Sequence, residues 1–133
     1  MSEQSTQIRD AIAQAIGENP VILFMKGTPE QPMCGFSART VAALQALNAP
    51  FAAVDILPDP RIRQELSALS QWPTIPQVFV KGELVGGADI VQELAENGDL
   101  RTILDERLGS GWESAPREER VVEVGSGSPF RLA

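Results

Sequence analysis

The only cysteine of this chain, Cys34, lies where a thiol is most easily activated. It follows a loop that begins at Lys26, directly after the apolar run Val21–Met25, and it precedes a helical pattern. Unpaired N–H groups at a helix start and the positive charge of Lys26 both favour thiolate over thiol. A lone cysteine is more often a small buried side chain without chemistry, but Pro32 and Gly35 are poor core neighbours. We therefore predict a functional Cys34 whose pKa lies below the usual thiol value.

The residue types that the chain lacks limit what Cys34 can do. Ser37 occupies the position of a partner thiol, so no second thiol of the chain can resolve a disulfide formed by Cys34. Without histidine, no Cys–His dyad, Ser–His–Asp triad or histidine metal ligand can be built. One cysteine also gives no disulfide framework, which favours a reducing compartment, and we expect the cytoplasm.

Composition indicates one globular domain with a substantial core. The chain has 133 residues, 43% of them apolar, and a net charge of −7. That charge disfavours nucleic acid and anionic membrane surfaces as partners. No apolar run approaches the ~20 residues of a membrane span, and the first residues lack the basic and apolar regions of a signal peptide.

The apolar pattern predicts an α/β order of elements over residues 1–108. Helices are indicated by apolar residues three or four positions apart, and strands by short apolar runs between turn residues. The expected order is helix, strand, helix, strand, helix, β-hairpin and two helices, with strands at Val21–Met25, Phe51–Ile56, Val78–Val80 and Leu84–Gly86. The first two strands and their helix form a parallel, right-handed βαβ unit. We expect a mixed four-stranded sheet flanked by helices.

Helix ends and faces follow from the same pattern. Ser5 or Thr6 is expected to cap the first helix, and Asp89 to cap a later one in a capping box with Gln92. The inner faces are expected to include Leu69, and to include Ile90 together with Leu94.

The pattern ends at Gly109, and residues 109–133 are expected to form a flexible tail. Val121, Val122 and Val124 are the exception, because they can add a short strand or contact a partner.

Three features elsewhere in the chain suit a site around Cys34. In Thr74-Ile75-Pro76, a cis Ile75–Pro76 bond would expose the Ile75 backbone as a strand edge, whereas a trans bond would make this an ordinary loop. Gly86-Gly87-Ala88-Asp89 leads into a helix start that suits a carboxylate, or is simply a tight turn. Arg63, taken alone, is a solvated surface arginine.

Together these segments resemble the monothiol glutaredoxins with a Cys-Gly-Phe-Ser active site. The resemblance covers residues of about 5–108 and rests on motifs that occur in the family's order: Met25-Lys-Gly27, Cys34-Gly-Phe-Ser37, Trp72-Pro-Thr74, Pro76-Gln77, Gly82-Glu-Leu-Val-Gly-Gly87 and Asp89. It implies a thioredoxin-like fold, glutathione binding and a bridging [2Fe-2S] cluster.

The resemblance also implies roles for individual residues. Cys34 would be the cluster ligand and the thiol that forms mixed disulfides with glutathione. Lys26 and Arg63 would hold the glycine-end carboxylate of glutathione. The loop Thr74-Ile75-Pro76 would pair with its cysteinyl part through the Ile75 backbone, and Gly87, Ala88 and Asp89 would receive its γ-glutamyl end.

Two departures from the family limit what can be transferred. Many relatives have a cysteine where this chain has Ala88, so no redox role for a second thiol is expected. Residues 109–133 lie outside the resemblance. The long loop from Gly27 to Met33 is typical of the Cys-Gly-Phe-Ser class, which favours cluster handling over fast reductase turnover.

Two functions follow as hypotheses. The first is an iron–sulfur cluster carrier: a [2Fe-2S] cluster needs four ligands, so two chains and two glutathiones would form a cluster-bridged homodimer. The resemblance suggests a BolA-family protein as partner and apo iron–sulfur proteins as recipients. The alternative is an enzyme, a glutathione-dependent thiol–disulfide oxidoreductase that removes glutathione from proteins.

Overall fold

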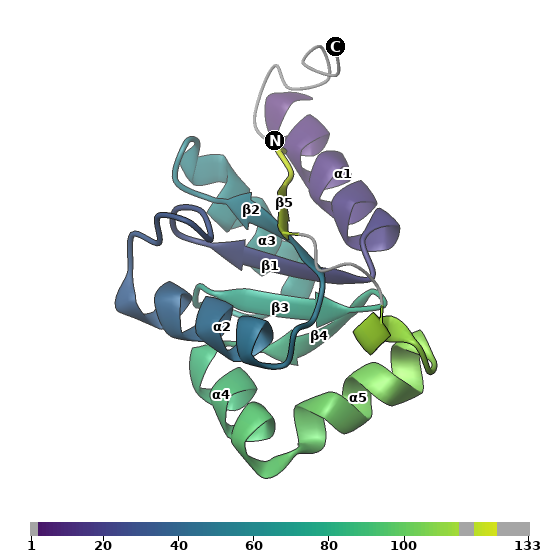
Figure 1. Ribbon diagram of the computed structural model, residues 1–133. Helices are drawn as coiled ribbons and strands as arrows, with labels where there is room; N and C mark the ends of the chain where they lie inside the picture. The colour runs from purple at the N-terminus through teal and green to yellow at the C-terminus, as the bar shows by residue number, and fades with distance from the viewer. Residues whose placement is uncertain (1–2, 115–118, 125–133) are drawn as a thin grey trace.

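The computed structural model describes residues 3–114 and 119–124 and contains one mixed, five-stranded sheet (Figure 1). The strands are β1 (Val21–Met25), β2 (Phe51–Asp55), β3 (Gln77–Val80), β4 (Glu83–Gly86) and β5 (Glu119–Val121), in the order β4-β3-β1-β2-β5. β1 pairs in parallel with β2 and antiparallel with β3. The mixed sheet is as predicted, and β5, which ends at Val121, is the short strand that the sequence left open in addition to the four expected ones.

Helices cover both faces of the sheet (Figure 1). The helices α1 (Glu3–Glu18) and α3 (Pro60–Ser70) pack on one face, while α2 (Gly35–Ala46), α4 (Ala88–Asn97) and α5 (Asp99–Leu108) pack on the other. None of these helices is both long enough and apolar enough to cross a membrane.

The central strand β1 explains why both faces need a cover. Its side chains alternate between two hydrophobic cores, with Leu23 in the core under α2, α4 and α5, and Ile22 and Phe24 in the core under α1 and α3. No residue of β1 is more than 3% exposed. A strand buried on both faces reads as a continuous apolar run, which is why the sequence predicts it well.

Three details of the helices differ from the sequence-based expectation. α1 already includes Glu3, so Ser5 and Thr6 lie within the helix. α4 begins at Ala88 with Gly87 as its N-cap, so Asp89 lies in the first turn and caps nothing. In this helix Val91 is buried in the core, and Ile90, 38% exposed, covers Gly86 instead.

Leu69 is the other apolar residue that was wrongly assigned to an inner face. It is 42% exposed in the last turns of α3. The same helix buries Ile62 and Leu66 at its centre, so its apolar stripe is shorter than the sequence pattern suggested.

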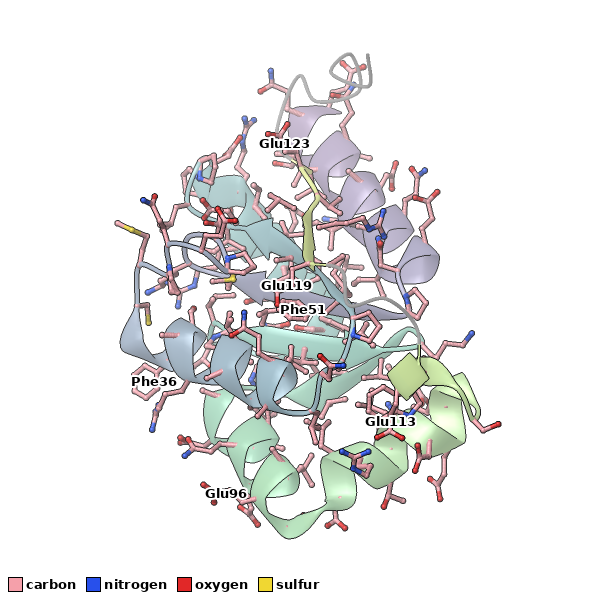
Figure 2. All side chains as sticks on the ribbon, viewed as in Figure 1. Phe36, Phe51, Glu96, Glu113, Glu119 and Glu123 are labelled. Carbon is pink, nitrogen blue, oxygen red and sulfur yellow. The ribbon has the colours of Figure 1, made fainter. Side chains whose placement is uncertain are left out.

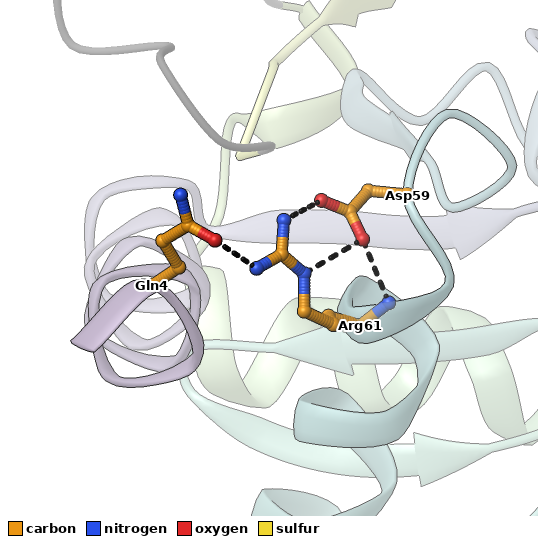
Figure 3. Close-up of polar contacts among 3 residues, drawn as sticks. All are labelled: Gln4, Asp59 and Arg61. Carbon is orange, nitrogen blue, oxygen red and sulfur yellow. Dashed lines mark hydrogen bonds and ion pairs between the residues drawn. The ribbon is translucent and has the colours of Figure 1, made fainter. Parts of the chain in front are cut away.

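Arg61 ties the start of α3 to the first turn of α1 (Figure 3). Its guanidinium makes two hydrogen bonds with the Asp59 carboxylate, at 2.7 and 3.1 Å, and donates to Gln4 Oε1 at 2.6 Å. Asp59 also caps α3 by accepting from the Arg61 N–H at 2.9 Å. Hydrogen bonding to Asp59 raises the pKa of Arg61 above its usual value.

The chain after Leu108 packs on the domain in the part that the structure describes. A 3₁₀ turn, η1 (Trp112–Ser114), buries Trp112, and the segment after β5 buries Val124, which is 2% exposed. The Val122 N–H donates to Ala53 O of β2 at 2.8 Å. The expected flexible tail is therefore wrong for residues 109–114, the strand left open near Val121 is present within residues 119–124, and 115–118 and 125–133 lie outside the described residues. The domain boundary at 108 remains a prediction.

Candidate functional site

Cys34 is the N-cap residue of α2, where its thiol is half-buried and free. Its backbone is extended, with φ −160° and ψ 137°, and its carbonyl accepts the first helical hydrogen bond from the Ala38 N–H at 2.9 Å. The backbone N–H of Ser37 is the main cause that lowers the pKa of the Cys34 thiol. The N–H of Phe36, the charge of Lys26 and the Ser37 hydroxyl act in the same direction, and partial burial opposes them. The predicted direction of the pKa shift is thus confirmed.

The loop before Cys34 is a short, internally bonded hairpin. The Met33 N–H donates to Lys26 O at 2.9 Å, and the Gly27 N–H donates to Asp55 Oδ1, at the end of β2, also at 2.9 Å. The Lys26 N–H donates to the buried Ser37 hydroxyl at 3.1 Å. These bonds tie the ends of both parallel strands to the first turn of α2, so the position of Lys26 relative to Cys34 is set by the fold.

Gly27 is required by this loop geometry. Its φ is +89°, and a Cβ placed there would lie 2.4 Å from Gln31 O. Any other residue would therefore push the loop away from Cys34.

A cavity of about 490 Å³ opens beside Cys34. All nine predicted site residues line it: Lys26, Cys34, Arg63, Thr74, Ile75, Pro76, Gly87, Ala88 and Asp89. Three further lining residues, Phe36, Trp72 and Ile90, had no predicted role. Phe36 and Trp72 occur in the motifs quoted above, but sequence alone did not show that their side chains face this space. Ile90 was missed because it was assigned to the core.

One wall of the cavity is the loop between α3 and β3. The Ile75–Pro76 peptide bond is cis. This agrees with the interpretation in which the Ile75 backbone is exposed as a strand edge, and not with that of an ordinary trans loop. Arg63 Nη2 donates to Pro73 O at 3.5 Å and is otherwise exposed toward solvent. Arg63 and Lys26 thus supply two cations to the cavity.

The adjoining wall is the start of α4. Gly87 caps the helix, and its carbonyl accepts from the Val91 N–H at 2.9 Å. A Cβ on Gly87 would lie 3.2 Å from both Pro76 O and Trp72 Nε1, so a side chain there would crowd the cavity wall. Helix N-termini attract anions through their free N–H groups and dipole.

The rim around Cys34 is apolar. Met33 is 67% and Phe36 54% exposed, and Phe36 points away from the start of α2 (Figure 2). The Arg39 guanidinium lies 4.9 Å from the Phe36 ring centre, and Arg39 Nη2 is 3.8 Å from Asp89 Oδ1. The site thus combines a thiol of lowered pKa, two cations, a helix start, and exposed apolar side chains beside Cys34.

Known proteins place this geometry in a family. The glutaredoxin family profile matches residues 21–85. "Glutaredoxin 4" of Haemophilus ducreyi is 53% identical over 97 residues, covering 73% of this chain and 91% of that protein. "Monothiol glutaredoxin-S17" of Arabidopsis thaliana is 48% identical over 104 residues, covering 78% of this chain and 21% of that protein. The chain belongs to the monothiol glutaredoxins.

Solved structures of glutaredoxins show the same fold. The solution structure of reduced poplar apo GrxS14 matches this glutaredoxin with a TM-score of 0.69 and 40% identity, covering 77% of this chain and 94% of that one. The crystal structure of a buckwheat glutaredoxin–glutathione complex matches with a TM-score of 0.72 and 24% identity, covering 84% and 99% of the two chains. The expected thioredoxin-like fold is confirmed.

Proposed function

We propose that this glutaredoxin binds glutathione in the cavity beside Cys34 and carries a [2Fe-2S] cluster as cargo between proteins. The observation that supports this most directly is the position of its one thiol. Cys34, a thiol whose pKa is lowered, lines a cavity that also contains two cations and a helix start, both of which suit carboxylates.

Glutathione fits the polarity of the cavity. Its glycine-end carboxylate would lie near Lys26 and Arg63, and its γ-glutamyl end near Gly87, Ala88 and Asp89 at the start of α4. The backbone of Ile75, between Thr74 and Pro76, would pair with its cysteinyl part as a strand edge does with a peptide. This orientation would bring the glutathione sulfur toward Cys34.

Ligand counting supports a cluster shared between chains. Iron–sulfur clusters prefer thiolates, and each chain offers one cysteine and no histidine. Within residues 3–114 and 119–124, no three His, Cys, Asp or Glu side chains are grouped as a metal site. A half-buried Cys34 at an apolar rim leaves room for ligands from outside the chain. We therefore propose a homodimer held by two Cys34 thiolates and two glutathiones.

The partners proposed for cluster transfer follow from the family. A BolA-family protein that brings its own ligand could replace one protomer, and apo iron–sulfur proteins would receive the cluster. A reducing compartment such as the cytoplasm suits a free thiol that must not form disulfides. The exposed Met33 and Phe36 give such partners an apolar surface next to the thiolate.

The second candidate function is removal of glutathione from proteins. The lowered pKa of Cys34 favours this activity, because the thiolate can attack a mixed disulfide. Free glutathione would then have to release the Cys34 adduct, since Ser37 has no thiol. Turnover of a glutathionylated protein, compared with cluster transfer rates, separates the two functions.

Anaerobic reconstitution with iron, sulfide and glutathione tests the main proposal. We expect a brown protein with the visible spectrum of a [2Fe-2S] cluster and, by native mass spectrometry, a dimer with one cluster and two glutathiones. The Cys34→Ser variant should remain colourless. A stable cluster formed without glutathione or another small thiol would overturn the proposal.

A further inference from the structure

Gln77 is the first residue of β3 and lies behind the cavity wall formed by the loop from Trp72 to Pro76. Its side chain is fully buried, although a polar amide is not driven into the core by the hydrophobic effect. The Nε2 group donates to Trp72 O at 2.9 Å and to Thr74 O at 3.0 Å. Both amide hydrogens are thus used on two carbonyls of one loop.

The Gln77 side chain is not explained by stability alone. Its Oε1 atom is buried and has no hydrogen-bond partner among the described residues. A buried acceptor left unpaired opposes folding. An apolar side chain of the same size would avoid this, so the amide is better explained by what it does to the loop.

The two bonds act on the part of the loop that faces the cavity. Pairing between β1 and β3 ends at Phe24 and Gln77, so Ile75 lies beyond the sheet's hydrogen-bond ladder. Thr74 is exposed and Trp72 half-exposed, so their carbonyls would turn toward water if Gln77 released them. Ile75, held between these carbonyls and the strand, would move with them.

We infer that Gln77 is a positioning residue that holds the Ile75 backbone in place for glutathione without touching the ligand. This inference rests on the glutathione site proposed above. The buried amide of Gln77, behind the loop that lines the cavity, would thus control how well the protein recognises the peptide part of glutathione. Cys34 lies on a different element, α2, so its chemistry should not depend on Gln77.

A disulfide-exchange equilibrium measures this recognition separately from thiol chemistry. The Cys34 thiolate attacks one sulfur of glutathione disulfide; the S–S bond breaks, the Cys34–glutathione mixed disulfide forms, and glutathione leaves as a thiolate. Hydroxyethyl disulfide reacts in the same way but has no peptide to recognise. The ratio of the two equilibrium constants is the preference for glutathione.

The test variant is Gln77→Met, which keeps the side-chain length and removes both donors. We expect the preference for glutathione to fall roughly tenfold, the effect of about one net hydrogen bond. The equilibrium with hydroxyethyl disulfide and the pKa of Cys34 should stay unchanged. If Gln77→Met does not fold, Gln77→Asn, too short to reach both carbonyls, is expected to lose several-fold of the preference.

Asn19→Leu is the matched control. Asn19 is also a buried amide bonded to a carbonyl, Ala15 O at 2.8 Å, but it lies before the opposite end of β1. Its loss should lower stability and leave the preference intact. An unchanged preference in the Gln77 variants would overturn the inference. So would an equal loss for both disulfides, or a similar loss in Asn19→Leu. A parent protein without any preference for glutathione would instead refute the proposed function itself.

Discussion

At the level of single residues, the reactivity of Cys34 comes mainly from backbone N–H groups and only secondarily from charge. The Ser37 N–H is the largest cause of the lowered pKa, ahead of the Phe36 N–H and Lys26. The buried Ser37 hydroxyl has a second task, because it also accepts from the Lys26 N–H at 3.1 Å. Ser37 therefore contributes to the site even though it cannot act as a resolving thiol.

The pKa shift predicts a pH-dependent stability difference. The folded pKa of Cys34 lies below the usual thiol value of 9.0, so thiolate formation stabilises the fold. This contribution is complete above the unfolded pKa and is lost as the pH falls through the folded pKa. We expect the free energy of unfolding of the parent, relative to Cys34→Ser, to rise with pH over this interval and then level off. Denaturant titrations at a series of pH values measure it.

Direct titration checks the cause of the same shift. Thiolate absorbance against pH should show a raised Cys34 pKa in Lys26→Gln and in Ser37→Ala, since each loses one stabilising group. Lys81→Gln, in the turn between β3 and β4, is the control and should leave it unchanged. A Cys34 in the parent that titrates at the usual thiol pKa would contradict this account.

Gly27 allows a sharp stability test. Gly27→Ala should destabilise the protein by roughly 1–3 kcal/mol, because the alanine must adopt a positive φ and its Cβ would collide with Gln31 O. Gly17→Ala, in the last turn of α1 where the new Cβ would meet no other part of the fold within 4 Å, should instead stabilise by about 0.5–1 kcal/mol. Urea unfolding measures the free energy of unfolding of both variants. If Gly27→Ala were as stable as Gly17→Ala, the loop would have to relax around the new Cβ without cost.

At the level of elements, β5 and η1 show that part of the chain after Leu108 is packed on the domain. β5 pairs with β2 and so covers an edge that a four-stranded sheet would leave open. Glu119 also accepts hydrogen bonds from Gln45 of α2 at 3.0 and 3.2 Å. The segment is thus bound to both the sheet and a helix.

Removal of residues 109–133 should therefore destabilise the domain. Trp112 and Val124 are buried at 6% and 2% exposure, and both would be lost. We expect the melting temperature to fall by more than about 5 °C. An unchanged melting temperature would show that these contacts contribute nothing.

Two valines near β5 give a finer test of the same point. Val124→Ala should cost about 1–3 kcal/mol, because the side chain is buried in the core under α1 and α3. Val121→Ala, three residues earlier and 52% exposed, should cost less than about 0.5 kcal/mol. Equal costs in thermal or urea unfolding would refute the docking of this segment.

At the level of the whole molecule, the fold separates the proposed glutathione contacts from the thiolate. The cations belong to the loop after β1 and to α3, whereas Cys34 belongs to α2. Loss of a cation should therefore weaken glutathione binding and leave the protein ligand of the cluster in place. The two kinds of variant are expected to differ in their response to added glutathione.

This difference can be measured by cluster reconstitution. Lys26→Gln and Arg63→Gln should need roughly tenfold more glutathione for half-maximal cluster content, the effect of one lost charge-assisted contact. Excess glutathione should restore both variants and never Cys34→Ser. Lys81→Gln, at the far end of the sheet, should behave as the parent. A failure of glutathione to restore Lys26→Gln would mean that Lys26 supports the cluster in another way.

The sequence by itself determined the order of elements from α1 to α5 and the reactive position of Cys34. The physical reason is local: buried strands are continuous apolar runs, helices repeat every three or four residues, and a thiol at a helix start is activated by neighbours within three positions. Six of the nine site residues could be named because the family motifs contain them, whereas Arg63, Ile75 and Ala88 lie outside the motifs and were named from the resemblance as a whole.

Only the tertiary structure decided how the remaining parts meet. Val121 follows a stretch without periodicity, and its strand β5 exists because β2 offers a free edge far away in the sequence. Ile90 could not be assigned to the rim until the start of α4 was placed at Ala88. Gln77 is likewise just a polar residue at the start of a strand until the loop from Trp72 folds back over its amide, because hydrogen bonds between distant segments leave no periodic trace in the sequence.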